Sequence, residues 1–165
     1  MTRPVLVLAC GTPDRGDDAA ALDAVALLDL VEPLARGRAV IRVVGQLGIE
    51  HLADRPDGAA VIVVDAAVGL RPGAVRFLPF AALADGARSP VPRSSHELPI
   101  PEIVGIAEIV GGPLEGGVLV VGGSDFGFGR PLSPAVEAAI PELAHQLAHA
   151  IEEAAAVRVG AGGRN

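Results

Sequence analysis

The sequence of 165 residues contains no lysine and only one cysteine, Cys10. Thirteen arginines are outnumbered by twenty acidic residues, which gives a net charge of -7. This balance disfavours a phosphate-backbone partner and permits a cationic one, so we expect no nucleic acid to bind. One cysteine allows no disulfide within the chain. Half of the residues are apolar, which is enough to build the core of a single domain.

Targeting and membrane signals are also missing. No basic segment followed by an apolar leader precedes the first strand-like run. No apolar stretch approaches the ~20 residues that a membrane helix requires, because glycine or an acidic residue interrupts each one. We therefore expect a cytoplasmic protein without a membrane partner. In the absence of a linker or an internal repeat, we expect one domain over residues 1–157 and a flexible tail over 158–165.

Continuous apolar runs of strand length are typical of strands that are buried on both faces. Four such runs occur, at residues 5–10, 39–44, 59–64 and 117–121. Residues 75–80 form a further strand candidate. The turn signal Arg71-Pro72-Gly73 before it predicts an antiparallel return from the third strand.

Between these runs, apolar spacing predicts helices. One begins at the acidic pair Asp17-Asp18 and ends near Pro33, with Leu22, Val25, Leu28 and Val31 on one stripe. The last begins at Ser133-Pro134 and repeats apolar residues at Val136, Ile140, Leu143, Leu147 and Ile151. A third begins around Pro101 with Ile103, Ile106, Ala107 and Val110, and a shorter one covers residues 46–53. Alternating strands and helices indicate an α/β fold, which binds ligands at the carboxyl ends of its strands.

The turn after the first strand lacks the lysine and hydroxyl that a phosphate loop requires after its last glycine. Two carboxylates, Asp17 and Asp18, stand there instead. They would repel a phosphate and offer oxygen ligands to a cation. Simple capping of the following helix is the alternative interpretation.

Asp65 ends the third apolar run, where a carboxylate needs a partner or a ligand because desolvating an unpaired charge is costly. The alternative is that Asp65 caps a following turn. His96 lies late in the long segment 81–99, and a lone loop histidine is usually only solvated. No second histidine follows at the spacing of a zinc protease.

Three other features are given structural interpretations. His145 and His149 share one helix face, which points away from the apolar stripe, so we expect a solvated pair rather than a metal site. Cys10 is expected to be a small buried residue rather than a nucleophile. The chain also has no Gly-x-Ser-x-Gly elbow of a serine hydrolase.

Taken in order, the motifs resemble the maturation endopeptidases of nickel-iron hydrogenases nearly from end to end. The segments that carry the resemblance are Gly11 with Gly16-Asp17-Asp18, Gly45-Gln46-Leu47-Gly48 with Leu52, Val63-Val64-Asp65-Ala66, Ser95-His96-Glu97-Leu98 and Leu132-Ser133-Pro134-Ala135-Val136. The chain departs from the family pattern in having Thr12 in place of an asparagine and Ala19 in place of a glycine. Pro99 and Pro101 also crowd the segment after His96.

The resemblance implies a three-layer α/β/α sandwich around a twisted, mostly parallel mixed sheet of about five strands. It also implies that Asp18, Asp65 and His96 converge on one divalent ion, a ligand set that suits nickel. The nickel would be supplied by the substrate, with no organic cofactor. The implied activity is removal of a C-terminal peptide from the nickel-loaded large-subunit precursor of a nickel-iron hydrogenase, with Asp18 or Asp65 assisting as base. A non-catalytic nickel-sensing maturation chaperone of the same fold is the alternative.

Overall fold

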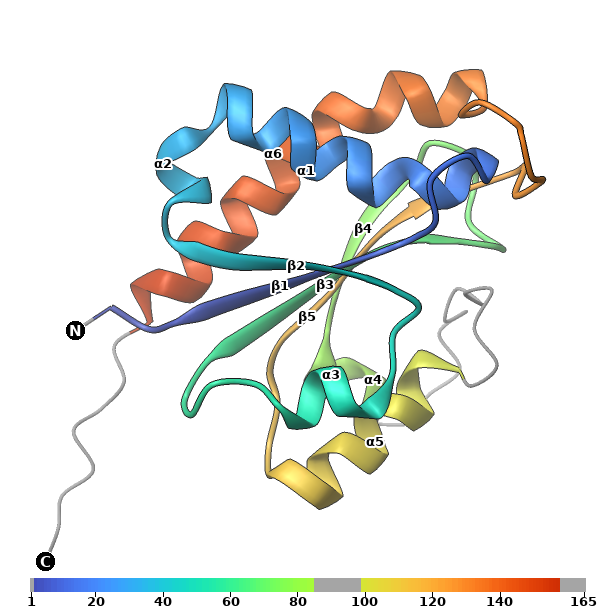
Figure 1. The fold of residues 1–165 in the computed structure, drawn as a ribbon. Helices are drawn as coiled ribbons and strands as arrows, with labels where there is room; N and C mark the ends of the chain where they lie inside the picture. Colours follow the sequence, from blue (N-terminus) through green and yellow to red (C-terminus); the bar gives the residue numbers. More distant parts are fainter. Residues whose placement is uncertain (1, 85–98, 158–165) are drawn as a thin grey trace, which may run out of the picture.

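The computed structural model describes residues 2–84 and 99–157, and it contains a twisted sheet covered by helices on both faces (Figure 1). The sheet has five strands in the order β2-β1-β3-β5-β4. Their bounds are Val5–Cys10 for β1, Ala39–Gly45 for β2, Ala60–Ala67 for β3, Val75–Pro79 for β4 and Glu115–Gly122 for β5. All neighbours pair in parallel except β4 and β5. The predicted three-layer fold with a mostly parallel mixed sheet is confirmed.

Strand β4 is antiparallel, as predicted, but its partner differs from the prediction. It pairs with β5, in a register that sets Val75 opposite Val121, and not with β3. The reason is that β3 already has a parallel neighbour on each side, β1 and β5. The chain leaving β3 therefore passes β5 before it can add a strand at the free edge.

Helices α1 (Ala20–Val31), α2 (Pro33–Arg36) and α6 (Pro134–Ala156) cover one face of the sheet (Figure 1). Helices α3 (Ile49–Ala53), α4 (Phe80–Ala84) and α5 (Ile100–Gly111) cover the other. Strand β1 supplies both cores because side chains alternate along a strand. Its residues Val5, Val7 and Ala9 face α1 and α6, whereas Leu6, Leu8 and Cys10 face the second helix layer.

Helix α6 begins after Ser133 with Pro134, as predicted, and all five residues of its predicted stripe are buried. The predicted apolar stripes of α1 and α5 are only partly confirmed. In α1, Leu28 is buried but Val31 is exposed, and alanines carry most of the contact with the sheet. In α5, Ile106 and Val110 are exposed, because the helix turns Ile100, Ile103, Val104 and Ala107 inward.

Two expectations fall on segments outside the described residues. His96 lies within residues 85–98, and the predicted tail covers residues 158–165. In the parts that are described, no helix combines the length and apolarity that a membrane crossing demands.

Candidate active site

Asp18 lies in a short 3-10 helix, η1 (Gly16–Ala19), which connects the turn after β1 to α1. Its carboxylate is buried, and its Oδ2 accepts a hydrogen bond from the backbone N–H of Thr12 at 2.8 Å. Gly11 makes this arrangement possible. Its φ of +140° is unfavourable for other residues, and a Cβ at this position would overlap the backbone oxygen of Asp18.

The alternative interpretation was that the acidic pair caps the following helix; both acids do lie in the first turn of η1, but no side-chain cap bond forms. Neither η1 nor α1 has a side-chain hydrogen bond at its N-cap, which is Arg15 for η1 and Ala19 for α1. Asp18 instead bonds backward to the turn at Thr12. Its carboxylate therefore fixes the shape of the turn that leads out of β1.

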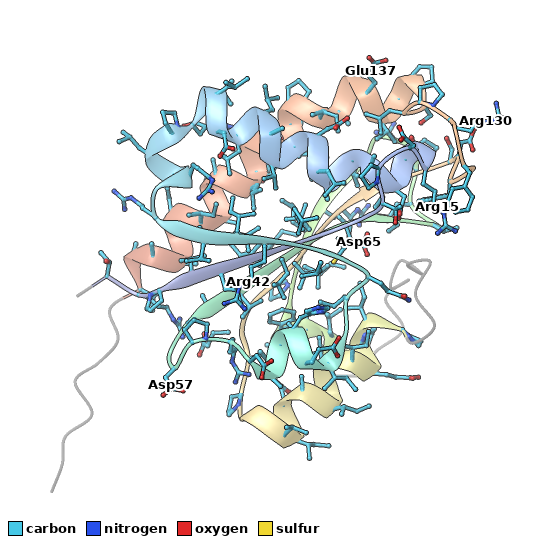
Figure 2. The ribbon with its side chains drawn as sticks, in the orientation of Figure 1. Arg15, Arg42, Asp57, Asp65, Arg130 and Glu137 are labelled. Carbon is cyan, nitrogen blue, oxygen red and sulfur yellow. The ribbon has the colours of Figure 1, made fainter. Side chains whose placement is uncertain are left out.

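Asp65 lies inside β3 near its carboxyl end and is almost fully buried. The strand continues through Ala67. The alternative interpretation, in which Asp65 caps a following turn, is therefore wrong. Its Oδ1 accepts a hydrogen bond from the backbone N–H of Ala66 at 2.9 Å. Figure 2 shows Asp65 at the end of the sheet where the turn after β1 also lies.

The thiol of Cys10, at the end of β1, is close to both carboxylates. Burial raises the pKa of this thiol, and the negative charges of Asp65 and Asp18 raise it further. Cys10 is fully buried, so the expectation of a small buried residue is confirmed. Strands β1 and β3 pair in parallel with Ala9 opposite Val64, and Asp18 bonds to the turn that directly follows β1, so Asp18 and Asp65 both lie at the carboxyl ends of these strands.

Asp17 is a third buried carboxylate, next to Asp18 in the chain, and the sequence pattern did not give it a separate function. It accepts hydrogen bonds from the backbone N–H groups of Ser124 (2.7 Å), Asp125 (3.0 Å) and Ser133 (2.7 Å), and from the Ser133 hydroxyl (2.9 Å). Burial alone would raise the pKa of Asp17, but these hydrogen bonds outweigh it, so its pKa lies below the usual range. The side chain therefore remains ionised although it is fully buried.

The bonds of Asp17 connect the turn after β1 to the segment between β5 and α6. Backbone bonds strengthen the connection, since Asp17 N–H donates to the Asp125 carbonyl at 2.7 Å and Gly16 N–H to the Arg130 carbonyl at 3.0 Å. Gly16 has a φ of +58°, and a Cβ there would overlap the Asp125 carbonyl oxygen. Asp18 thus projects from a turn that is held on both sides.

Two of the three predicted site residues, Asp18 and Asp65, are placed together, and the third, His96, lies outside the described residues. Within the described ranges, no three His, Cys, Asp or Glu side chains gather closely enough to hold a metal ion. His145 and His149 are both exposed, in agreement with the expected solvated pair. His149 lies 3.4 Å from Glu153 on the same helix face.

The fold and the paired carboxylates place the chain among α/β-sandwich proteins that hold an acidic site at the carboxyl edge of the sheet. Solved structures with this fold include the hydrogenase maturating endopeptidase HybD from E. coli, which is 24% identical with a TM-score of 0.67 and aligns over 91% of this chain and 93% of its own. The hydrogenase maturation protease HybD from Thermococcus kodakarensis is 22% identical with a TM-score of 0.66, over 92% of this chain and 99% of its own.

The maturation protease HycI from Thermococcus kodakarensis KOD1 is 20% identical with a TM-score of 0.65, over 92% of this chain and 94% of its own. No curated protein sequence matches the chain. The family model described as hydrogenase maturation protease, HycI, matches residues 43–150. The chain therefore belongs to the hydrogenase maturation protease family, whose members are peptide hydrolases.

Proposed function

We propose that the protein removes a C-terminal peptide from the nickel-loaded large-subunit precursor of a nickel-iron hydrogenase, and that Asp18, Asp65 and His96 recognise the nickel. The single observation that carries the proposal is the pair of buried carboxylates on β3 and η1, which lie at the same edge of the sheet. Two carboxylates at one edge of the sheet offer oxygen ligands to a cation.

In this mechanism the metal belongs to the substrate. Two carboxylates and one imidazole leave coordination positions open, which suits a nickel ion that the precursor already holds. The ion supplies Lewis acidity toward the scissile carbonyl or the attacking water. Asp18 or Asp65 accepts a proton from the water as its oxygen adds to the carbonyl carbon. The C–N bond then breaks, and the proton passes to the departing amine.

The position of Asp18 suits this part in the reaction. The carboxylate is fixed by the Thr12 N–H and by a turn that Asp17 anchors, so it can meet the metal with little rearrangement. Asp65 is on β3, the central strand of the sheet, which is paired with a neighbour on each side. The two groups together would hold the metal and the reacting carbonyl in a fixed relation.

The test is cleavage of the nickel-loaded large-subunit precursor of the hydrogenase that the same genome encodes, followed by mass spectrometry. The wild-type protein should release a C-terminal peptide, and the nickel-free precursor should stay intact. Asp18→Asn, Asp65→Asn and His96→Ala should each reduce cleavage by at least about a hundredfold. Asp57→Asn is the matched control, because Asp57 is an exposed carboxylate in the turn before β3, remote from the site (Figure 2).

The competing function, a nickel-sensing maturation chaperone, makes a different prediction in the same experiment. It requires the wild-type protein to bind the nickel-loaded precursor without shortening it, with Asp65→Asn weakening only the association. Intact precursor after incubation with the wild-type protein, together with retained binding, would replace the protease proposal by the chaperone.

A further inference from the structure

Arg15 is the N-cap residue of η1, and its side chain is partly buried. Its Nε donates a hydrogen bond to the carbonyl of Phe126 at 3.3 Å, and its central carbon lies 4.9 Å from the centroid of the Phe128 ring. The backbone of Arg15 also forms a parallel bridge to Arg130. Stacking and hydrogen bonding together restrict the guanidinium group to one region.

The charge of Arg15 is not neutralised by the surrounding protein. Within residues 2–84 and 99–157, no carboxylate lies at ion-pair distance from it. The nearby Asp125 is engaged elsewhere, since its Oδ1 accepts the Gly127 N–H at 3.0 Å and its Oδ2 lies 3.6 Å from Nε of Arg130. The two Nη groups of Arg15, which form the end of the planar fork, have no hydrogen-bond partner in the described part of the chain.

The backbone of Arg15 lies near that of Asp18, one of the two proposed site acids. Arg15 is three residues from Asp18, and three residues span at most about 11 Å between α-carbons. Figure 2 shows Arg15 at the same end of the sheet as Asp65. The Phe128 ring beside it is 78% exposed, although it packs on the guanidinium. A polypeptide bound at the two carboxylates would therefore reach Arg15 and Phe128 within a few residues of the scissile bond.

We propose that Arg15 and Phe128 form a subsite for a carboxylate of the precursor's C-terminal segment, a proposal that rests on the proposed function. The fork of Arg15 pairs with the carboxylate, and the Phe128 ring contacts the neighbouring apolar part of the peptide. The carboxylate is supplied either by the chain terminus or by an Asp or Glu side chain of the segment. Because Asp18 and Asp65 repel such a group, a fixed cation at the same end of the sheet determines where an acidic tail can bind.

The first test uses protein variants and the nickel-loaded precursor. Arg15→Gln should raise KM about tenfold with kcat changed by less than about twofold, because a charge-assisted contact remote from the scissile bond contributes to binding. Phe128→Ala should raise KM by a smaller factor. Arg42→Gln is the matched control, since Arg42 is an exposed arginine on the edge strand β2 (Figure 2), and its KM should equal the wild-type value. An unchanged KM for Arg15→Gln overturns the proposal.

The second test leaves the protein unaltered and changes the substrate. Semisynthetic precursors carry either a C-terminal amide or Asn and Gln in place of the Asp and Glu residues of the tail. The change that raises KM for the wild-type protein identifies the source of the carboxylate, and the same change should have no further effect on Arg15→Gln. Equal KM values for all precursors, or effects that simply add to that of Arg15→Gln, overturn the proposal.

A third variant gives a readout that a structural function for Arg15 would not produce. Arg15→Glu should bind the acidic tail more weakly and should bind a tail with lysine at the identified position more tightly. The Arg42→Glu control should show no such change in preference. If the wild-type protein binds the precursor without cleaving it, calorimetric Kd values replace KM in every comparison. The proposed function then fails while the Arg15 subsite is still tested.

Discussion

Asp17 and Ser133 are 116 residues apart in the sequence and joined by two hydrogen bonds, one from the Ser133 backbone N–H at 2.7 Å and one from its hydroxyl at 2.9 Å. Ser133 is the N-cap residue of α6, but its side chain makes no cap bond to that helix. Its hydroxyl donates to Asp17 instead. The start of the longest helix is therefore fixed to the turn that presents Asp18.

Replacement of Asp17 by asparagine should lower the free energy of unfolding by about 2–4 kcal/mol, because an amide nitrogen would face buried N–H donors. Urea denaturation measures this loss. Ser133→Ala removes only one donor and should cost about 1 kcal/mol. The exposed Asp57→Asn serves as control and should change stability by less than about 0.5 kcal/mol. A loss for Asp17→Asn no larger than that of the control would contradict the anchoring function.

The Asp17 carboxylate should also make the free energy of unfolding depend on pH in the acidic range. The pKa of Asp17 in the folded state lies below its ordinary value of 3.8, so the contribution of this group is fully present above that value. It is lost as the pH falls through the folded-state pKa. The difference in unfolding free energy between the wild type and Asp17→Asn should therefore be constant near neutral pH and shrink below about pH 4. Urea titrations between pH 2.5 and 7 follow this difference, and one that grows in acid would reverse the sign we assign.

Gly11→Ala should displace Asp18, because the added Cβ would overlap the Asp18 backbone oxygen and the φ of +140° is strained for alanine. We expect precursor cleavage to fall by at least tenfold and unfolding free energy by about 2–3 kcal/mol. Gly58→Ala is the matched control. Its φ is also positive, +71°, but the space around it is open, so only about 1 kcal/mol and no cleavage should be lost. Equal effects of the two substitutions on cleavage would show that Gly11 does not position Asp18.

Cys10 should be unreactive in the folded protein, because burial and the charges of Asp65 and Asp18 raise its pKa and keep the thiol protonated. An aromatic disulfide reagent at pH 8 should label it at least a hundredfold more slowly in buffer than in 6 M urea. Cys10→Ala should retain precursor cleavage within about threefold, since the thiol is not used in the proposed chemistry. Rapid labelling of the native protein, or loss of cleavage in Cys10→Ala, would contradict this assignment.

The parts of the fold that follow from short-range pattern could be predicted from the sequence. Strands such as β1 are apolar on both faces because helices cover both, and α6 has an apolar repeat that sets one face inward. The face of α5 could not be predicted, because Ile103 and Ala107 lie on both the predicted and the observed stripe. Whether Ile106 or Val104 joins them on the buried face is decided only by the packing of the helix against the rest of the fold.

The candidate site, like the fold, could be predicted only in part from the sequence. The positions of Asp18 and Asp65 after predicted strands indicated that they share one edge of the sheet. The function of Asp17 depends on hydrogen bonds to residues more than 100 positions away, and no local pattern reports such contacts. The adjacent Asp17-Asp18 pair was the available signal, since two neighbouring carboxylates in one tight turn cannot both face the same cleft. The contribution of His96 stays a prediction.

The two neighbouring acids in η1 are chemically identical and differ only in direction. One points toward the β5–α6 segment, where amide and hydroxyl hydrogens surround it, and the other toward the turn at Thr12 and the thiol of Cys10. Adjacent positions in a single turn of helix thus have different environments, and in the proposed function they divide stability and chemistry between them. Insertion or deletion of one residue between Gly16 and Ala19 would rotate both side chains away from these partners, so the length of the turn matters as well as its residues.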